Sequence, residues 1–105
     1  MRTIEDDAVL KILADVIKIP SVNDHELTVA KYLQALLAKY DISAKIHPIT
    51  GDRANLVAEI GHGQPVLAVS GHMDVVAAGD LAAWDTDPFT LVEKSGQLFG
   101  RGVTD

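Results

Sequence analysis

Cysteine is absent from the chain, which excludes a disulfide framework and a thiolate metal site. A metal ion bound here would need imidazole and carboxylate ligands instead. Basic residues are few, since nine Lys and Arg stand against fifteen Asp and Glu and leave a net charge of −6. This balance argues against a nucleic-acid partner, because binding a phosphate backbone needs clustered Lys and Arg.

Long apolar runs and aromatic residues are also scarce. No stretch approaches the roughly 18 apolar residues of a membrane span, so no membrane partner is expected. The acidic start of the chain does not resemble a signal peptide, and a cytoplasmic location is predicted. Trp84 and Phe89 lie close together in a predicted loop, and we expect them to form a small cluster that pins it. The remaining composition is typical of one small globular domain without repeats or linkers.

Two amphipathic helices are predicted in the first forty residues. Apolar residues recur at helical spacing within Thr3–Ile19, and Pro20 ends this first helix. The same spacing recurs from Val29 to Tyr40. Asn23 or Asp24 is predicted to cap this second helix, and Glu26 follows Asn23 by three residues, as in a capping box. Both helices are expected to cover one face of a sheet.

Three strands are expected to follow these helices, with a hairpin near the end. Apolar and polar residues alternate over 42–46 and again over 54–60, the pattern of half-buried strands. The run Val66–Val69 is continuously apolar and predicts a strand buried on both faces. A further hairpin is predicted over 90–99, around Lys94-Ser95-Gly96. The fold class predicted is therefore α/β, with a mixed sheet covered by helices.

Two ionisable residues, His72 and Asp74, come directly after the predicted buried strand. In open α/β sheets, ligand sites lie just beyond the carboxyl ends of strands. An imidazole there can bind a metal, and a carboxylate two residues on can hold its other ring nitrogen. Asp105 adds a carboxylate after a glycine-flanked turn, and a carboxylate can bridge two metal ions that activate water. These ligands suit Zn²⁺, or else Co²⁺ or Mn²⁺. A His and an Asp in an ordinary surface turn is the alternative.

Other sites fit the sequence less well. Ser70 lacks the flanking glycines of a nucleophile elbow, which argues against a serine hydrolase. Gly61-x-Gly63 lacks the third glycine and the following helix of a phosphate loop. The remaining histidines are predicted on a helix start, a strand face and a distant turn, away from His72: His25, His47 and His62.

A set of short motifs occurs in a fixed order in the second half of the chain and resembles the M20 metallopeptidase family. The motifs are Gly71-His72-Met73-Asp74-Val75-Val76, Gly79-Asp80, Trp84, Asp87-Pro88-Phe89, Gly96 and Gly100-Arg101-Gly102-x-x-Asp105. Asn55–Ala58 also resembles the second strand of the family. The segment from Gly79 to Trp84 is most similar to the branch of acetylornithine deacetylase and succinyl-diaminopimelate desuccinylase.

This resemblance implies a fold and a set of roles. The fold would be zinc-exopeptidase-like but incomplete, with 1–105 as the N-terminal portion of a metallohydrolase catalytic domain. His72 would be a metal ligand, Asp105 would bridge two Zn²⁺ ions, and Asp74 would serve catalysis by orienting the His72 imidazole. In the family, the general-base Glu, the remaining ligands and the lid domain follow the position of Asp105. The lid domain is missing here, and in the complete protein it is expected to form a homodimer.

The activity implied is that of a di-zinc hydrolase in amino-acid biosynthesis. It would remove an acetyl or succinyl group from an amino-acid-like substrate by metal-activated water. An M20-type dipeptidase or aminoacylase is the first alternative, and a non-catalytic scaffold domain of the same fold is the second. The expected partner is a small N-acyl amino acid or peptide. The chain alone is expected to be inactive, because its metal ligands are too few.

Overall fold

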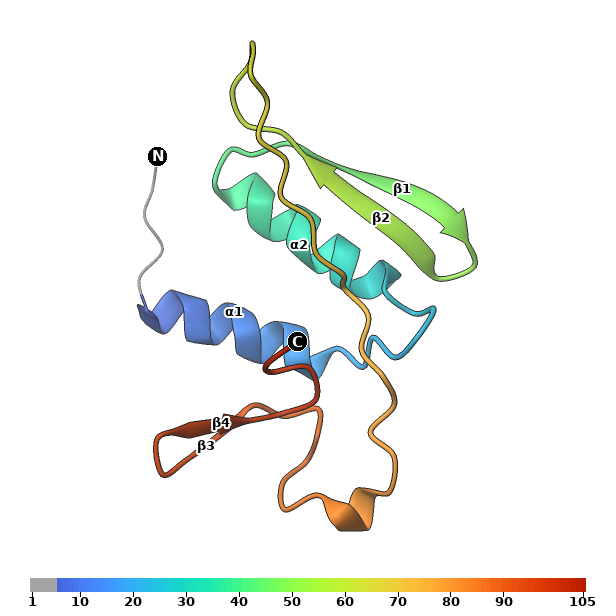
Figure 1. The fold of residues 1–105 in the computed structure, drawn as a ribbon, viewed down its shortest axis with the longest axis vertical. Helices are drawn as coiled ribbons and strands as arrows, with labels where there is room; N and C mark the ends of the chain where they lie inside the picture. The colour runs from blue at the N-terminus through green and yellow to red at the C-terminus, as the bar shows by residue number, and fades with distance from the viewer. Residues whose placement is uncertain (1–5) are drawn as a thin grey trace.

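The computed structural model describes residues 6–105, and two helices form the first third of this part of the chain (Figure 1). Helix α1 spans Asp6–Lys18, with two acidic residues in its first turn and Lys18 in its last, as the helix dipole favours. Helix α2 spans Leu27–Lys39. Both predicted helices are confirmed, although the expected start at Thr3 lies outside the described residues.

The predicted capping box of α2 is wrong. Glu26 occupies the cap position, but its side chain makes no capping hydrogen bond. It is buried and lies near Arg53, with 3.4 Å between Glu26 Oε1 and Arg53 Nε. The backbone amide of Leu27 donates instead to the carbonyl of Asp52 at 2.8 Å. The turn that contains Asp52 therefore caps the start of α2. This is a long-range contact that local residue spacing does not encode.

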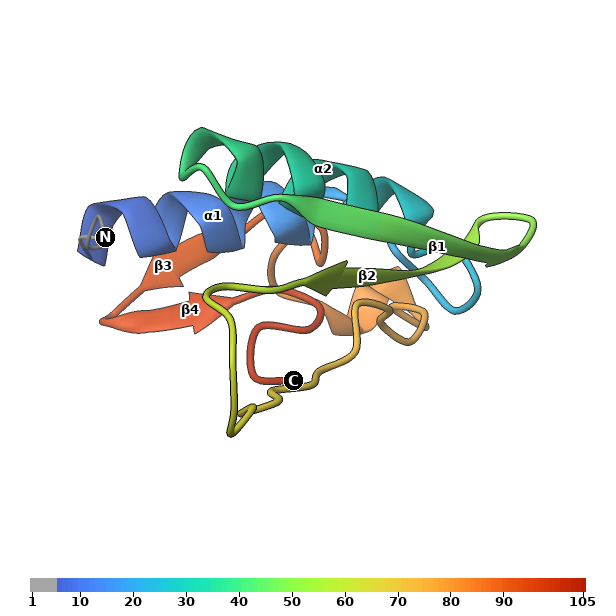
Figure 2. The same ribbon diagram turned by 90° about the horizontal axis from the view of Figure 1, so that it is seen from above.

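Strands β1 (Ala44–Thr50) and β2 (Arg53–Ala58) form an antiparallel hairpin that packs along α2 (Figure 2). The Gln34 side chain of α2 donates to the carbonyl of Ala44 at 3.0 Å and ties the two layers together. The small core consists of Ile17, Val29, Ala30 and Ala54, each at most 4% exposed. Strands are confirmed in both regions of predicted alternation, 42–46 and 54–60. The first begins two residues later than predicted and continues to Thr50, and the second ends at Ala58.

The strand predicted over Val66–Val69 is wrong for the chain as described. This segment runs as an irregular connection beyond β2 (Figure 1), and Val66, Leu67 and Val69 are 72–91% exposed. Within residues 6–105 the strands form two separate two-stranded antiparallel sheets, so no mixed sheet is present there. A strand needs a neighbour to satisfy its backbone groups, and no described segment is hydrogen-bonded alongside this one. The helices and small sheets are compatible with the α/β class.

The last third of the chain returns to α1. A 3₁₀ turn at Leu81–Ala83 is capped by Asp80, whose side chain accepts a hydrogen bond from the amide of Ala82 at 3.0 Å. Strands β3 (Val92–Lys94) and β4 (Gln97–Phe99) form the predicted hairpin. Among the described residues, no helix is both long and apolar enough to cross a membrane.

Candidate functional site

The His72 ring lies between two acidic residues. Its Nδ1 atom is 3.0 Å from the backbone carbonyl oxygen of Asp74 and 3.4 Å from a carboxylate oxygen of the same residue. Its Nε2 atom is 3.5 Å from a carboxylate oxygen of Asp105. The structure therefore brings the three predicted site residues together. The nearest acceptor for Nδ1 is a main-chain carbonyl, whereas the sequence suggested the Asp74 carboxylate.

Asp105 reaches His72 through a tight turn over 100–105. The amide of Arg101 donates to the carbonyl of Pro88 at 2.7 Å, and the amide of Asp105 donates to the carbonyl of Gly102 at 3.3 Å. Gly102 has φ +85°, and a Cβ atom there would lie 2.7 Å from Val75 Cγ1. Only glycine permits both the backbone conformation and this close approach. The turn is thereby packed directly against the segment that carries His72 and Asp74.

The loop that runs from Asp74 toward the turn with Asp105 is held by Trp84 and Arg101. The indole of Trp84 donates to the carbonyl of Ala78 at 2.9 Å, and the Arg101 guanidinium lies 5.0 Å from the centre of the Trp84 ring. Such a cation–π contact is worth about 0.5–1 kcal/mol at an exposed position. Trp84 thus holds the loop through polar contacts, while the expected cluster of Trp84 with Phe89 stays a prediction. Phe89 lines a hollow of about 240 Å³ beside the site, with Ile17 and Val29.

The surroundings of His72 favour its protonated form. The hydrogen bond to the Asp74 carbonyl raises the pKa of the imidazole, and the Asp105 carboxylate raises it further. The ring is about half exposed, so solvent weakens both effects. A proton and a metal ion compete for the same nitrogen lone pair. Metal binding at His72 would therefore release a proton and would weaken as pH falls.

His72 and Asp105 are spaced like two ligands of one metal ion. Two ligands held about 2.0–2.2 Å from one tetrahedral ion lie about 3.4 Å from each other, which is close to the Nε2–carboxylate separation of His72 and Asp105. Within residues 6–105, however, no group of three His, Asp or Glu side chains comes together as a metal site. His25 pairs with Asp52 at 3.2 Å, while His47 lies in β1 and His62 follows β2. The described residues fit a metal ion as two members of a larger ligand set.

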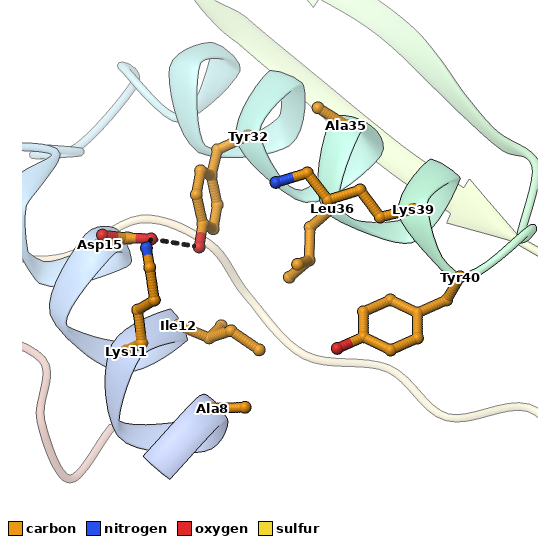
Figure 3. A pocket seen from close by; sticks show the side chains of 9 residues that line it. All are labelled: Ala8, Lys11, Ile12, Asp15, Tyr32, Ala35, Leu36, Lys39 and Tyr40. Atoms are coloured by element: carbon orange, nitrogen blue, oxygen red, sulfur yellow. Dashed lines mark hydrogen bonds and ion pairs between the residues drawn. The ribbon is translucent and has the colours of Figure 1, made fainter. Parts of the chain in front are cut away.

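A second hollow, of about 360 Å³, lies between α1 and α2 (Figure 3). Asp15 accepts hydrogen bonds there from the Lys11 ammonium and the Tyr32 hydroxyl, each at 2.8 Å. Burial raises the pKa of Tyr32 to about 12, and the bond to Asp15 adds to the effect. The same two donors hold the pKa of Asp15 below its usual range. This hollow shares no residue with the His72 site, and three of its polar side chains, Lys11, Asp15 and Tyr32, pair with one another.

Residues 68–105, which include all three site residues, match the family described as Peptidase family M20/M25/M40. The predicted resemblance to the M20 family is thereby confirmed, by this match and by the relatives that follow. It is 54% identical over its whole length to a "probable succinyl-diaminopimelate desuccinylase" of Staphylococcus epidermidis. It is 48% identical over its whole length to a protein of the same name from Staphylococcus aureus. Over 90% of its length it is 39% identical to a succinyl-diaminopimelate desuccinylase of Legionella pneumophila. It spans 25–26% of the length of these relatives.

Proposed function

We propose that the complete protein is a metal-dependent hydrolase that removes a succinyl group from a succinylated amino acid. The carrying observation is the placement of His72 between Asp74 and Asp105, with 3.5 Å between Nε2 and the Asp105 carboxylate. This arrangement lies inside the segment that matches the M20 family. The names of the relatives favour succinyl over acetyl, which is the nearest alternative. The cytoplasmic location expected from the sequence stays a prediction.

His72 and Asp105 would hold a divalent metal ion, Zn²⁺ or else Co²⁺ or Mn²⁺, with Asp105 shared between two ions. When bound, such an ion would polarise the scissile carbonyl and lower the pKa of its bound water. A carbonyl oxygen only accepts hydrogen bonds, so the neutral ring must carry its proton on Nδ1, which faces the Asp74 carbonyl at 3.0 Å. The Nε2 lone pair then lies on the Asp105 side. Asp74 thus selects the tautomer that can bind a metal.

The chain supplies only part of this machinery. A catalytic zinc usually has three protein ligands and also needs a base for its water. We propose that 1–105 forms the N-terminal portion of a zinc-exopeptidase-like catalytic domain, and that other parts of the complete protein supply the missing ligands, the general base and a dimerising lid. The chain alone should then bind metal weakly and should not turn over an acyl amino acid.

The test compares substrates and variants of the complete protein. Stripped of metal and reloaded with Zn²⁺, it should release succinate from an N-succinyl amino acid faster than acetate from the N-acetyl analogue. His72→Ala should lose both metal and activity, while His47→Ala, a matched histidine in β1, should keep both. Equal activity of His72→Ala and the wild type would refute the proposal.

A dipeptide, added to the N-succinyl and N-acetyl substrates, separates the alternatives. Preferential cleavage of a dipeptide would favour the dipeptidase, and preferential release of acetate would favour the deacetylase or aminoacylase. A metal-loaded protein that cleaves none of these substrates would favour the scaffold domain.

A further inference from the structure

We propose that Ser21, in the connection between α1 and α2, is a positioning residue for the His72 site. Ser21 is 2% exposed, and its side-chain oxygen donates to the backbone carbonyl of Met73 at 3.1 Å. Its own backbone carbonyl accepts a hydrogen bond from the amide of Val75 at 2.8 Å. The amide of Asn23 donates to the carbonyl of Val75 at 3.0 Å. One short connection therefore holds the residues on both sides of Asp74.

These hydrogen bonds fix the two peptide planes that flank Asp74. The Met73 carbonyl belongs to the peptide unit before Asp74, and the Val75 amide belongs to the unit after it. That second unit also contains the Asp74 carbonyl, which faces His72 Nδ1 at 3.0 Å. In a trans peptide the N–H and C=O groups point in opposite directions. Because Ser21 holds the Val75 amide on one side, the Asp74 carbonyl is directed to the other side, toward the imidazole.

Ser21 has a large share in positioning residues 73–75, because the residues before them in the chain make few contacts. Residues 66–72 are exposed and belong to no strand, and the first ladder contact beyond them is the parallel bridge between Val22 and Val75. The Gly102 turn packs against Val75 from another direction. The Ser21 hydroxyl thus fixes the peptide plane before Asp74. The orientation of that plane helps to set the position of the Asp74 carbonyl that faces the imidazole.

This inference rests on the proposed metal-dependent function, so metal binding is measured separately from hydrolysis. The variant is Ser21→Ala in the complete protein, which removes the hydroxyl and keeps both backbone hydrogen bonds. The control is Gln34→Met, which removes another side-chain bond to a backbone carbonyl, that of Ala44, and touches no site residue. Zn²⁺ affinity is obtained by competition with a chromophoric chelator. Hydrogen exchange is followed over the segment that contains Met73–Val75 in the metal-free protein.

In Ser21→Ala, the amides of this segment should exchange faster, and the protein should bind Zn²⁺ about 10-fold more weakly. This is the lower end of the loss seen when a group that holds a metal ligand in place is removed. Ser21→Thr, which restores a hydroxyl, should recover most of the affinity. Gln34→Met should leave both measurements unchanged.

Faster exchange with wild-type Zn²⁺ affinity would overturn the proposal, because Ser21 would then be structural only. An equal loss of affinity in Ser21→Ala and Gln34→Met would overturn it as well. A wild-type protein that binds Zn²⁺ through His72 but hydrolyses no acyl amino acid would defeat the proposed function, and the Zn²⁺ affinities would still decide the role of Ser21.

Discussion

Two clusters in this chain each place an acidic side chain next to a titratable ring, and they differ in how their charges are balanced. In the cluster between the helices, the Asp15 carboxylate accepts one hydrogen bond from the Lys11 ammonium and one from the Tyr32 hydroxyl (Figure 3). In the other cluster, His72 faces the carboxylates of Asp74 and Asp105. Among the ion pairs of residues 6–105, His72 is the sole basic partner of those two carboxylates.

This difference in charge balance indicates which cluster is suited to bind a positively charged ligand. The Lys11–Asp15–Tyr32 cluster is electrically neutral and joins α1 to α2, so a structural role explains it fully. The His72 cluster carries an excess of negative charge on groups that metals prefer, and two of its groups are spaced for one ion. Perturbed pKa values occur in both clusters. The charge balance separates them, and the following changes test that distinction.

The largest effect is expected from Gly102→Ala in the complete protein. The new Cβ would meet Val75 Cγ1 at 2.7 Å and would sit at a positive φ. We expect loss of most bound Zn²⁺ and a lower free energy of unfolding by about 1–3 kcal/mol. Gly96→Ala is the matched control, because Gly96 also has positive φ, +75°, but a Cβ added there would meet no atom within 4 Å. Equal loss of metal in both variants would show that backbone strain, and not the contact with Val75, disrupts the site.

A smaller effect is expected from Asp74→Asn. The main-chain carbonyl that receives Nδ1 at 3.0 Å is unchanged in this variant, and only the carboxylate at 3.4 Å is replaced. Turnover should fall about 10-fold, with most of the metal retained. Metal content and kcat on the purified variant provide the measurement. A loss of metal as complete as in His72→Ala would instead make Asp74 a direct ligand.

Sequence reasoning recovered the elements whose signals are local. Helical spacing predicted α1 and α2, and alternation with turn residues predicted the hairpins. It failed for Val66–Val69, because a continuous apolar run reports hydrophobicity and does not identify the neighbour that would cover it. Within the described residues no such neighbour is hydrogen-bonded to the run, and its side chains are exposed.

The site was partly predictable for a similar reason. The ordered motifs pointed to His72, Asp74 and Asp105 through resemblance to a family. No local pattern indicated that Ser21 would hold the peptide planes beside Asp74, since that contact joins residues 52 positions apart. The position of Arg101 over Trp84 was not predicted either. Contacts of this kind depend on tertiary packing, which spacing along one segment cannot encode.

The smallest effect is expected from Tyr32→Phe, which tests the neutral cluster. The folded pKa of Tyr32 is about 12, whereas a free tyrosine titrates near about 10. The neutral phenol is thus favoured by folding, so its contribution is complete below about pH 10 and is lost as pH rises through about 12. Phenolate absorbance of the chain should show Tyr32 titrating at about pH 12.

Tyr32→Phe should remove that high-pH titration, while Tyr40→Phe should keep it, and these two are the only tyrosines in the sequence. In the complete protein, Tyr32→Phe should also leave Zn²⁺ affinity unchanged, because the hollow it lines shares no residue with the His72 site. A weakened Zn²⁺ affinity would show that the helix pair and the metal site are coupled. The connection that carries Ser21 would then be the route to examine, since it joins α1 to the segment that holds Asp74.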